Sequence, residues 1–524
     1  MKRTALTAAA FGVSLAAAVP ATMPAAASAV INLVPQTLSA PDSNLSTSTT
    51  GLACEFPDGS GGYADFHCNT PADIRAAYGV DQVGSASAGT GLLGQGQTIV
   101  LVDSYGSPTA AHDLGVFHDT FFNNLPSPDF TQVYPLGKPN YANANSSGLS
   151  GPSAAASWSG EATLDIEWAY SIAPLAHIVL MAVPPAETLG VQGFPTMFNA
   201  ISSAIDTYPA GTIFSMSFAV SEPTFNGAAA VQTAKFDKVL AKGTAKGDSF
   251  FSSSGDNGTT GYAKQHKESR TYSYPTVEWP TTSPYVTSVG GTQLQYGWTW
   301  NPSSDVSFTS NGANPDYFAS TSGGLTETVW NESWLPAATG GGPSVIYKRP
   351  AWQDSVASSI TTTSGHQVNA RAVPDLSWDA AVNGGVLVYI TAFPTYQRSG
   401  WHLYGGTSAS SPQVAALTAL ANQSRTDLGK GPIGDVAPLL YTHSAAFATN
   451  NAFRDIVPTT QGSASVGVLA NNSLWDWNGL DVADSPGPVA GHPTTTGWDM
   501  TTGFGSPLAQ GYIATLTDLS PYQP

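Results

Sequence analysis

The chain has 524 residues, enough for one large domain or for two or three ordinary ones. Hydrophobic residues make up 42% and charged residues only 10%, which permits a large core and argues against wholesale disorder. The formal net charge of -18 argues against nucleic acid or another polyanion as a partner. With every carboxylate protonated, the 18 lysine and arginine and nine histidine residues would carry 27 positive charges, a modest number for this length, so the composition suits an acidic medium.

The N-terminus has the pattern of a secretory signal peptide. Two basic residues precede an apolar run that ends in the small residues 27–29, and we expect cleavage after Ala29. A membrane anchor is the weaker alternative, because Pro20 and Pro24 interrupt the run. No later segment has the roughly 18 continuous apolar residues of a spanning helix. The pattern therefore predicts a secreted protein with no membrane attachment once residues 1–29 are removed.

A short leader, residues 30–69, is expected to follow. It is rich in Ser, Thr and Pro as far as about residue 52, and it contains Cys54 and Cys68, the only two cysteines of the chain. Export and an even count of cysteines favour one disulfide between them, and two free thiols are the alternative.

From residue 70 onward, apolar runs alternate with helical patterns. Thr70 as N-cap and Pro71 at the first helical position predict a helix over 70–80. The predicted strands are 98–103, 177–183, 212–217, 249–254, 285–290 and 385–390, and the further predicted helices are 109–122, 160–173, 195–207, 230–242 and 409–423. Short apolar strands separated by helices indicate an α/β fold with a mainly parallel central sheet, flanked by helices and buried on both faces. Because 70–520 contains no repeat and no strong linker, we expect residues 70–524 to form a single large domain.

Ser408 is the strongest candidate nucleophile. It lies in YGGTSASSPQVAAL (404–417), where two glycines allow a tight turn before a small-residue helix. A Ser at a helix start can point its hydroxyl outward while its own N–H donates to a developing oxyanion. A plain Ser N-cap is the alternative. The pattern is not GxSxG, so it does not predict a nucleophile elbow.

A nucleophilic Ser needs a base, and none of the nine histidines lies in a motif typical of one. Glu161 and Asp165 are four residues apart, so they share one face of the predicted helix. As like charges they repel unless one proton is shared, and such a pair can act as base and orienter. Two acids on a solvated helix face are the alternative. Glu167 falls outside this face and is expected to be structural.

Asp256 lies in SSSGDNG (252–258), directly after a predicted strand. It could be a turn residue. It could also be a protonated carboxyl group that donates a hydrogen bond to an oxyanion.

Together, GGTSAS (405–410), GEATLDIEWAYSIAP (160–174) and SSSGDNG (252–258) resemble the sedolisin family of serine-carboxyl peptidases. The resemblance covers about residues 68–518 and implies a subtilisin-like fold and cleavage of proteins or peptides at acidic pH. By resemblance, Glu161 is the general base and Asp165 its orienting acid. Asp256 is the oxyanion acid and Ser408 the nucleophile. Asp103 stands where subtilisins carry their aspartate, and we give it a supporting role at most, hydrogen-bonded to Asp165.

The C-terminal part resembles the family's calcium site, in FRDIV (453–457) and TTTGWDMTTGFGSP (494–507). The resemblance implies one Ca²⁺ ion held by oxygen ligands. The implied ligands are the carboxylates of Asp455 and Asp499 and the main-chain carbonyls of Ile456, Thr495 and Gly497.

Three departures from the family pattern stand out. Only about 40 residues separate the signal from the Thr70 helix, too few for the family's folded prodomain. Ser217, Phe218 and Ala219 replace Ser-Trp-Gly at the substrate-binding strand, so the subsite preferences are expected to differ. The 457–494 segment resembles an insertion near the calcium site, with no role that the sequence reveals.

These observations predict a secreted, monomeric, acid-active endopeptidase or tripeptidyl-peptidase with protein or peptide substrates. A catalytically inactive binding or cell-surface protein on a peptidase fold is the main alternative. A neutral-pH subtilisin would lack its histidine, and an acid glycosidase would leave Ser408 idle.

Overall fold

The computed structural model describes residues 52–57, 63–84, 91–139, 141, 152–184, 191–225, 227–262, 271–300, 318–332, 337–382, 384–395, 399–458, 470–474 and 489–523. The predicted signal peptide and most of the predicted leader lie outside these ranges.

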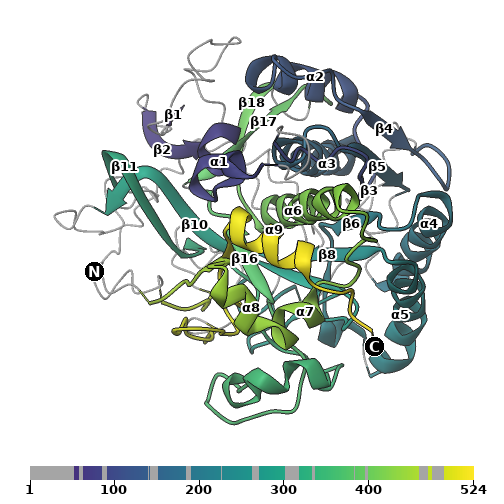
Figure 1. Ribbon diagram of the computed structural model, residues 1–524, viewed down its shortest axis with the longest axis vertical. Helices are drawn as coiled ribbons and strands as arrows, with labels where there is room; N and C mark the ends of the chain where they lie inside the picture. The colour runs from purple at the N-terminus through teal and green to yellow at the C-terminus, as the bar shows by residue number, and fades with distance from the viewer. Residues whose placement is uncertain are drawn as a thin grey trace, which may run out of the picture.

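A large central sheet organises the fold (Figure 1). Its strand order is β11-β10-β8-β6-β3-β5-β4, and β16 also pairs with β10. The strands are β3 (Thr98–Ser104), β4 (Phe130–Val133), β5 (His177–Val183), β6 (Ile213–Met216), β8 (Ser249–Ser253), β10 (Thr287–Trp300), β11 (Phe318–Val329) and β16 (Leu376–Asp379). All neighbouring pairs are parallel except β10 with β11. The predicted α/β class with a mainly parallel sheet is therefore confirmed.

Helices cover both faces of this sheet. They are α1 (Pro71–Ala77), α2 (Ala110–Phe121), α3 (Pro152–Ile172), α4 (Phe194–Thr207), α5 (Ala229–Lys246), α6 (Thr407–Asp427), α7 (Ala437–Thr442), α8 (Ser444–Thr449) and α9 (Ala509–Asp518). The 3-10 helices are η3 (Val80–Gln82), η5 (Glu222–Phe225) and η7 (Ala351–Ser359). The largest differences from the predicted helix bounds are in three helices. Helix α3 begins two turns before residue 160, α5 extends to Lys246 rather than 242, and α6 begins before Ser408 and ends at Asp427 rather than 423.

The alternation of side chains along β3 and β6 separates the two cores. Ile99, Leu101 and Ile213 pack into the core that contains α3, α6 and α9, whereas Val102 and Phe214 pack into the core of α4 and α5. The residues that end β3 and β6 on the first side therefore face α3 and α6.

A second, four-stranded sheet has the order β1-β2-β17-β18. It consists of β1 (Leu52–Pro57), β2 (Tyr63–Asn69), β17 (Gly385–Ile390) and β18 (Gly400–Tyr404). The strand predicted over 385–390 is present as β17, but the prediction that it belongs to the central sheet was wrong. Its apolar side chains are buried against α2 and α3 instead, and an apolar run cannot tell which sheet a strand joins.

Six further short strands make two-residue pairings around the sheet ends. They are β7 (Val220–Ser221), β9 (Glu278–Trp279), β12 (Asn331–Glu332), β13 (Ala337–Ala338), β14 (Gly342–Pro343) and β15 (Ala372–Val373). Near the C-terminus, β19 (Phe453–Arg454) pairs with β20 (Ser506–Pro507).

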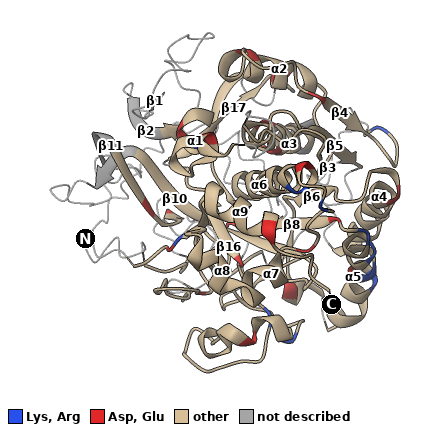
Figure 2. Ribbon diagram, viewed as in Figure 1, with Lys and Arg blue, Asp and Glu red and all other residues tan. Residues whose placement is uncertain are grey.

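The N-cap predicted for the first helix is confirmed. The Thr70 hydroxyl accepts the Asp73 N–H, and the Asp73 carboxylate accepts the Thr70 N–H at 2.9 Å, which together form a capping box. Charged side chains are sparse, and Figure 2 shows the most conspicuous group of basic residues along α5. Within the described part of the chain, no helix is long and apolar enough to cross a bilayer.

Candidate active site

The paired acids lie inside the protein. Glu161 exposes 3% of its surface and Asp165 exposes none. Their helix, α3, packs against β3 and α6, and α3 and α6 lie side by side at the centre of Figure 1. Burial excludes the alternative of a solvated acidic face. Glu167 contacts a different element, since its carboxylate accepts the Tyr389 N–H of β17 at 3.0 Å.

A serine at the end of β6 holds Asp165. The Ser217 hydroxyl lies 3.0 Å from Oδ1 and 2.8 Å from Oδ2 of Asp165, and it donates to this carboxylate. The resemblance assigned Ser217, Phe218 and Ala219 to substrate binding. The side chain of Ser217 contacts Asp165, and the side chains of Phe218 and Ala219 are buried in the core beside α4. Substrate binding by these three residues stays a prediction.

Asp103 is the second-last residue of β3 and lies on the face that α3 and α6 cover. It is fully buried, and neither of its carboxyl oxygens has a hydrogen-bond donor among the described residues. Burial raises the pKa of Asp103 to about 7. Below that pH the protonated carboxyl group of Asp103 can itself donate a hydrogen bond. Its predicted bond to Asp165 stays a prediction.

The carboxyl group of Asp256 is hydrogen-bonded to Thr407, the first residue of α6. Its Oδ1 accepts the Thr407 N–H at 2.8 Å and the Thr407 hydroxyl at 2.7 Å. Thr407 directly precedes Ser408, which is itself buried, so two residues 152 positions apart in the chain are brought to one place. Gly406, the N-cap of α6, has φ 109°, a value that strongly favours glycine.

Sequence reasoning missed the role of Thr407. The residue lies inside GGTSAS, but nothing in a local pattern shows that a threonine there will bind a carboxylate from another strand end.

Glu278 is a second buried acid near Asp256 that the sequence did not single out. Neither of its carboxyl oxygens has a hydrogen-bond partner among the described residues. A Cβ on Gly255 would lie 2.6 Å from Glu278 Oε2, so only glycine fits beside it without a shift. Burial, reinforced by the charge of Asp256, raises the pKa of Glu278 well above its usual value.

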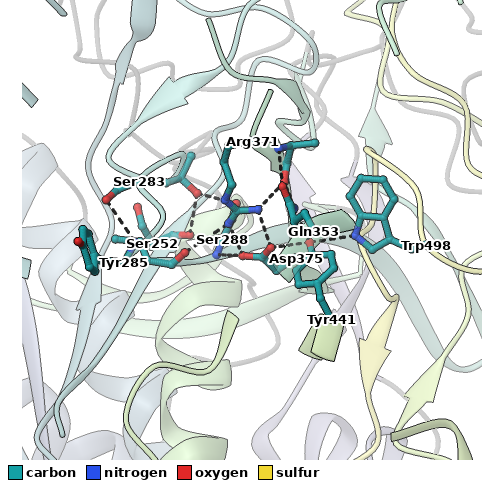
Figure 3. Close-up of polar contacts among 12 residues, drawn as sticks. Ser252, Ser283, Tyr285, Ser288, Gln353, Arg371, Asp375, Tyr441 and Trp498 are labelled. Atoms are coloured by element: carbon teal, nitrogen blue, oxygen red, sulfur yellow. Dashed lines mark hydrogen bonds and ion pairs between the residues drawn. The ribbon is translucent and has the colours of Figure 1, made fainter. Parts of the chain in front are cut away.

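A buried polar network connects β8 and β10 with the C-terminal part of the chain (Figure 3). At its centre, Arg371 and Asp375 form a two-pronged ion pair at 2.8 and 2.6 Å, with both side chains fully buried. Asp375 also accepts the Ser288 N–H at 2.8 Å and the Tyr441 hydroxyl at 2.6 Å. Trp498 donates its indole N–H to the Tyr441 hydroxyl at 3.1 Å.

Trp498 lies within the segment that the resemblance assigned to calcium. The Gly497 N–H donates to Asp455 Oδ2 at 2.8 Å, which brings the two predicted halves of the site together across 42 residues. Asp499 accepts the Thr495 N–H on Oδ2 and the Thr501 N–H on Oδ1, at 2.8 and 2.9 Å.

The carboxylate and carbonyl oxygens of these two segments are ligands of the type that a hard cation prefers. Asp455 Oδ2 and Asp499 Oδ2 each accept one N–H and keep a lone pair for a metal ion, whereas Asp499 Oδ1 already accepts from Thr501 and Thr502. Ca²⁺ prefers carboxylate and carbonyl oxygens. The described residues contain no group of three or more His, Cys, Asp or Glu side chains that could hold a metal. A cation here would therefore depend on main-chain carbonyls as well as the two carboxylates.

Comparison with known proteins gives consistent matches. The model of the subtilase family matches residues 170–461, more than half of the chain. Kumamolisin of Bacillus sp. (strain MN-32) is 30% identical over 448 residues, which are 84% of this chain and 62% of kumamolisin. Sedolisin of Pseudomonas sp. (strain 101) is 32% identical over 260 residues, which are 47% of this chain and 36% of sedolisin. The chain thus spans less than two thirds of the length of these relatives.

A solved structure agrees with the architecture. Pseudomonas sedolisin, a serine-carboxyl proteinase complexed with two molecules of pseudo-iodotyrostatin, superposes with a TM-score of 0.56 at 23% identity. The match covers 86% of this chain and 97% of that one, and it supports the subtilisin-like fold. The chain belongs to the subtilase family.

Proposed function

We propose that this protein is an acid-active serine-carboxyl peptidase that hydrolyses peptide bonds through an acyl-enzyme on Ser408. One observation carries the proposal: the buried carboxyl group of Asp256 binds Thr407, the residue next to Ser408, at the start of α6. A carboxyl group placed there suits a donor to an oxyanion that develops at Ser408. The similarity to kumamolisin and sedolisin supports the same reading.

In the proposed mechanism, Glu161 takes the proton of Ser408 Oγ while Oγ forms a bond to the scissile carbonyl carbon. Asp165, held by Ser217, orients Glu161. Asp256 Oδ1 accepts from Thr407, so the catalytic proton belongs on Oδ2, where it and the Ser408 N–H stabilise the oxyanion. The tetrahedral intermediate then collapses, and Glu161 returns the proton to the leaving amine. Water releases the acyl group by the reverse sequence, with Glu161 again as base.

Two carboxyl protons are needed in this mechanism, one on Asp256 and one shared by Glu161 and Asp165. Activity is therefore expected to fall as the pH approaches neutrality.

The test compares wild type with Ser408→Ala, Glu161→Ala and Asp256→Leu, which has no donor at this position, on a denatured protein substrate between pH 3 and 7. We expect cleavage by wild type at acidic pH and a loss on the order of 10²–10³ in rate for Asp256→Leu. The two alanine variants should be inactive. Absence of acid cleavage by wild type, or undiminished cleavage by both alanine variants, would rule the mechanism out.

We also propose one Ca²⁺ ion at the Asp455–Asp499 segment pair, with the carbonyls of Ile456, Thr495 and Gly497 as further ligands. The contact between Gly497 and Asp455 supports the joining of the two halves. The ion would supply positive charge that holds the two segments together.

Secretion, removal of residues 1–29, a monomeric state and a protein or peptide substrate are part of the same proposal. A disulfide between Cys54 and Cys68 completes it. Strand β1 pairs with β2 in a register that sets Leu52 opposite Cys68, two residues from Cys54. The side chain of Cys54 lies outside the described residues.

A further inference from the structure

Part of the 457–494 segment forms a short two-stranded stem, residues 470–474 and 489–493. Leu474 and Val489 exchange two main-chain hydrogen bonds, at 3.2 and 3.1 Å, and their side chains pack together. Asn472 closes the stem toward His492, because it donates its N–H to the His492 carbonyl at 3.2 Å and accepts the His492 N–H on Oδ1 at 2.7 Å.

The stem binds the loop that carries Asp256, residues 254–260, which we call the oxyanion loop. The Asn472 carbonyl accepts the Thr259 N–H at 3.0 Å. Gly258 has φ 58°, and a Cβ at that position would lie 2.4 Å from the same carbonyl. A left-handed conformation and this close approach both require glycine, so the main chains of the loop and the stem are closely fitted.

The opposite edge of the oxyanion loop is bound by residues 338–341. The Ala338 N–H donates to the Asp256 carbonyl at 3.0 Å, and the Gly340 N–H donates to the Gly255 carbonyl at 2.7 Å. Asn472 reaches this segment too, since its Nδ2 donates to the Gly341 carbonyl at 3.3 Å.

Asn472 is fully buried, and its N–H, carbonyl, Oδ1 and Nδ2 are all hydrogen-bonded. One residue thus joins the stem, the oxyanion loop and the segment on the far side of that loop. The stabilisation of an oxyanion depends on donor placement within a few tenths of an ångström, so a residue that clamps the loop from two sides acts on the rate.

We propose that Asn472 is a positioning residue for Asp256, and that the 457–494 segment serves the active site through this stem. The proposal rests on the proposed peptidase function. It gives a role to a segment whose sequence alone suggests none.

The test uses Asn472→Ala beside a matched control, Asn422→Ala. Asn422 is also buried and also joins two main-chain groups, because its Oδ1 accepts the Ile433 N–H at 2.9 Å and its Nδ2 donates to the Gly211 carbonyl. It lies 14 residues beyond Ser408 on α6, about 21 Å along the helix. Both variants lose a comparable structural clamp, and only one of them lies at the oxyanion loop.

Two readouts separate positioning from plain stability. For Asn472→Ala we expect kcat to fall by about 10- to 100-fold with KM within about twofold, since part of an oxyanion donor's effect is lost. A peptide aldehyde, whose adduct with Ser408 places an oxygen in the oxyanion position, should bind more weakly by a similar factor. The corresponding peptide alcohol, which forms no adduct, should bind unchanged.

Asn422→Ala should leave kcat and both affinities near wild type while lowering the melting temperature. A fall in melting temperature for Asn472→Ala with kcat and aldehyde affinity equal to those of the control would overturn the positioning role alone. A wild type without acid peptidase activity would overturn the proposed function and this assignment together.

If the alanine variant does not fold, Asn472→Asp tests the same positioning role. A protonated Asp can accept from His492 and donate to the Gly341 carbonyl, whereas the ionised form cannot donate. The kcat of this variant relative to wild type should therefore recover at the acidic end of the profile and fall as the pH rises. A ratio that stays constant with pH counts against the assignment.

Discussion

At the end of β6, one hydroxyl group bears on the proposed catalytic acids without touching the reacting atoms. Ser217 donates to both carboxylate oxygens of Asp165 and is fully buried. A hydrogen bond to a charged group contributes about 1.5–3 kcal/mol, so its loss changes both the orientation and the proton affinity of Asp165. Local sequence did not reveal this contact, because Ser217 and Asp165 lie 52 residues apart and meet only through the packing of α3 on the sheet.

Ser217→Ala is predicted to lower kcat by roughly 10- to 100-fold, the rate equivalent of that hydrogen bond. Loss of the donor disfavours ionised Asp165, so the pH profile of kcat/KM should also shift. Ser217→Thr, which retains the hydroxyl, should restore most of the rate and the profile. A Ser217→Ala variant with the wild-type profile and a lowered melting temperature only would show that the hydroxyl is structural.

At the scale of elements, Trp498 anchors the proposed calcium segment to α7. Its indole N–H reaches the Tyr441 hydroxyl, which donates in turn to Asp375 of the buried ion pair with Arg371. Order in the 495–499 turn is thereby linked to a part of the core where a broken contact costs about 3–5 kcal/mol. The segment should therefore unfold together with the domain rather than fray alone.

Removal of calcium with a chelator is predicted to lower the melting temperature of wild type by several degrees. An ion at about 100 times its Kd stabilises the folded state by about 2.7 kcal/mol, and added Ca²⁺, but not Mg²⁺, should restore the temperature. Asp455→Asn should start from the lower temperature and respond little to the chelator. Asp129→Asn, which changes an exposed carboxylate on the surface, should respond like wild type. An unchanged wild-type melting temperature would remove the ion from the proposal.

At the scale of the whole molecule, several buried or partly buried carboxyl groups form no ion pair with the described residues. Burial raises the pKa of Glu222 and Asp435 to about 7, and that of Asp73 and Asp237 to about 6. In the unfolded chain such groups titrate near pH 4. Between pH 4 and 7 the folded state therefore holds more protons than the unfolded state, and stability falls as the pH rises through this window.

The midpoint of urea unfolding is predicted to be highest near pH 4 and to decrease steadily toward pH 7. Asp435→Asn, which cannot ionise, should make this slope shallower, because burial raises the pKa of Asp435 to about 7 and it therefore contributes over the whole window. Asp354→Asn, at an exposed position, should leave the slope unchanged. A midpoint that rises with pH across this range would contradict the prediction.

The α/β class, most of its strands and helices and the shared helix face of Glu161 and Asp165 could be predicted from local sequence patterns. Apolar strands between amphipathic helices report burial on two faces, and the 161/165 spacing reports a shared helix face. The contacts of Thr407 with Asp256 and of Asn472 with Thr259 span 151 and 213 residues, so no local signal carries them. The strand at 385–390 shows the same limit, because its composition records that it is buried but not which strands it joins.

The helix that carries Ser408 has no solvent-facing side over residues 407–423, and α9 closes it from one direction. Near its end, Arg425 binds the last carbonyls of α9, at Leu516, Thr517 and Leu519. A chain still being synthesised has made Ser408 about a hundred residues before it has made α9. The proposed nucleophile is thus synthesised before the helix that completes its surroundings. If Ser408 has the proposed role, a growing chain lacks a complete peptidase site while its own segments are still unfolded.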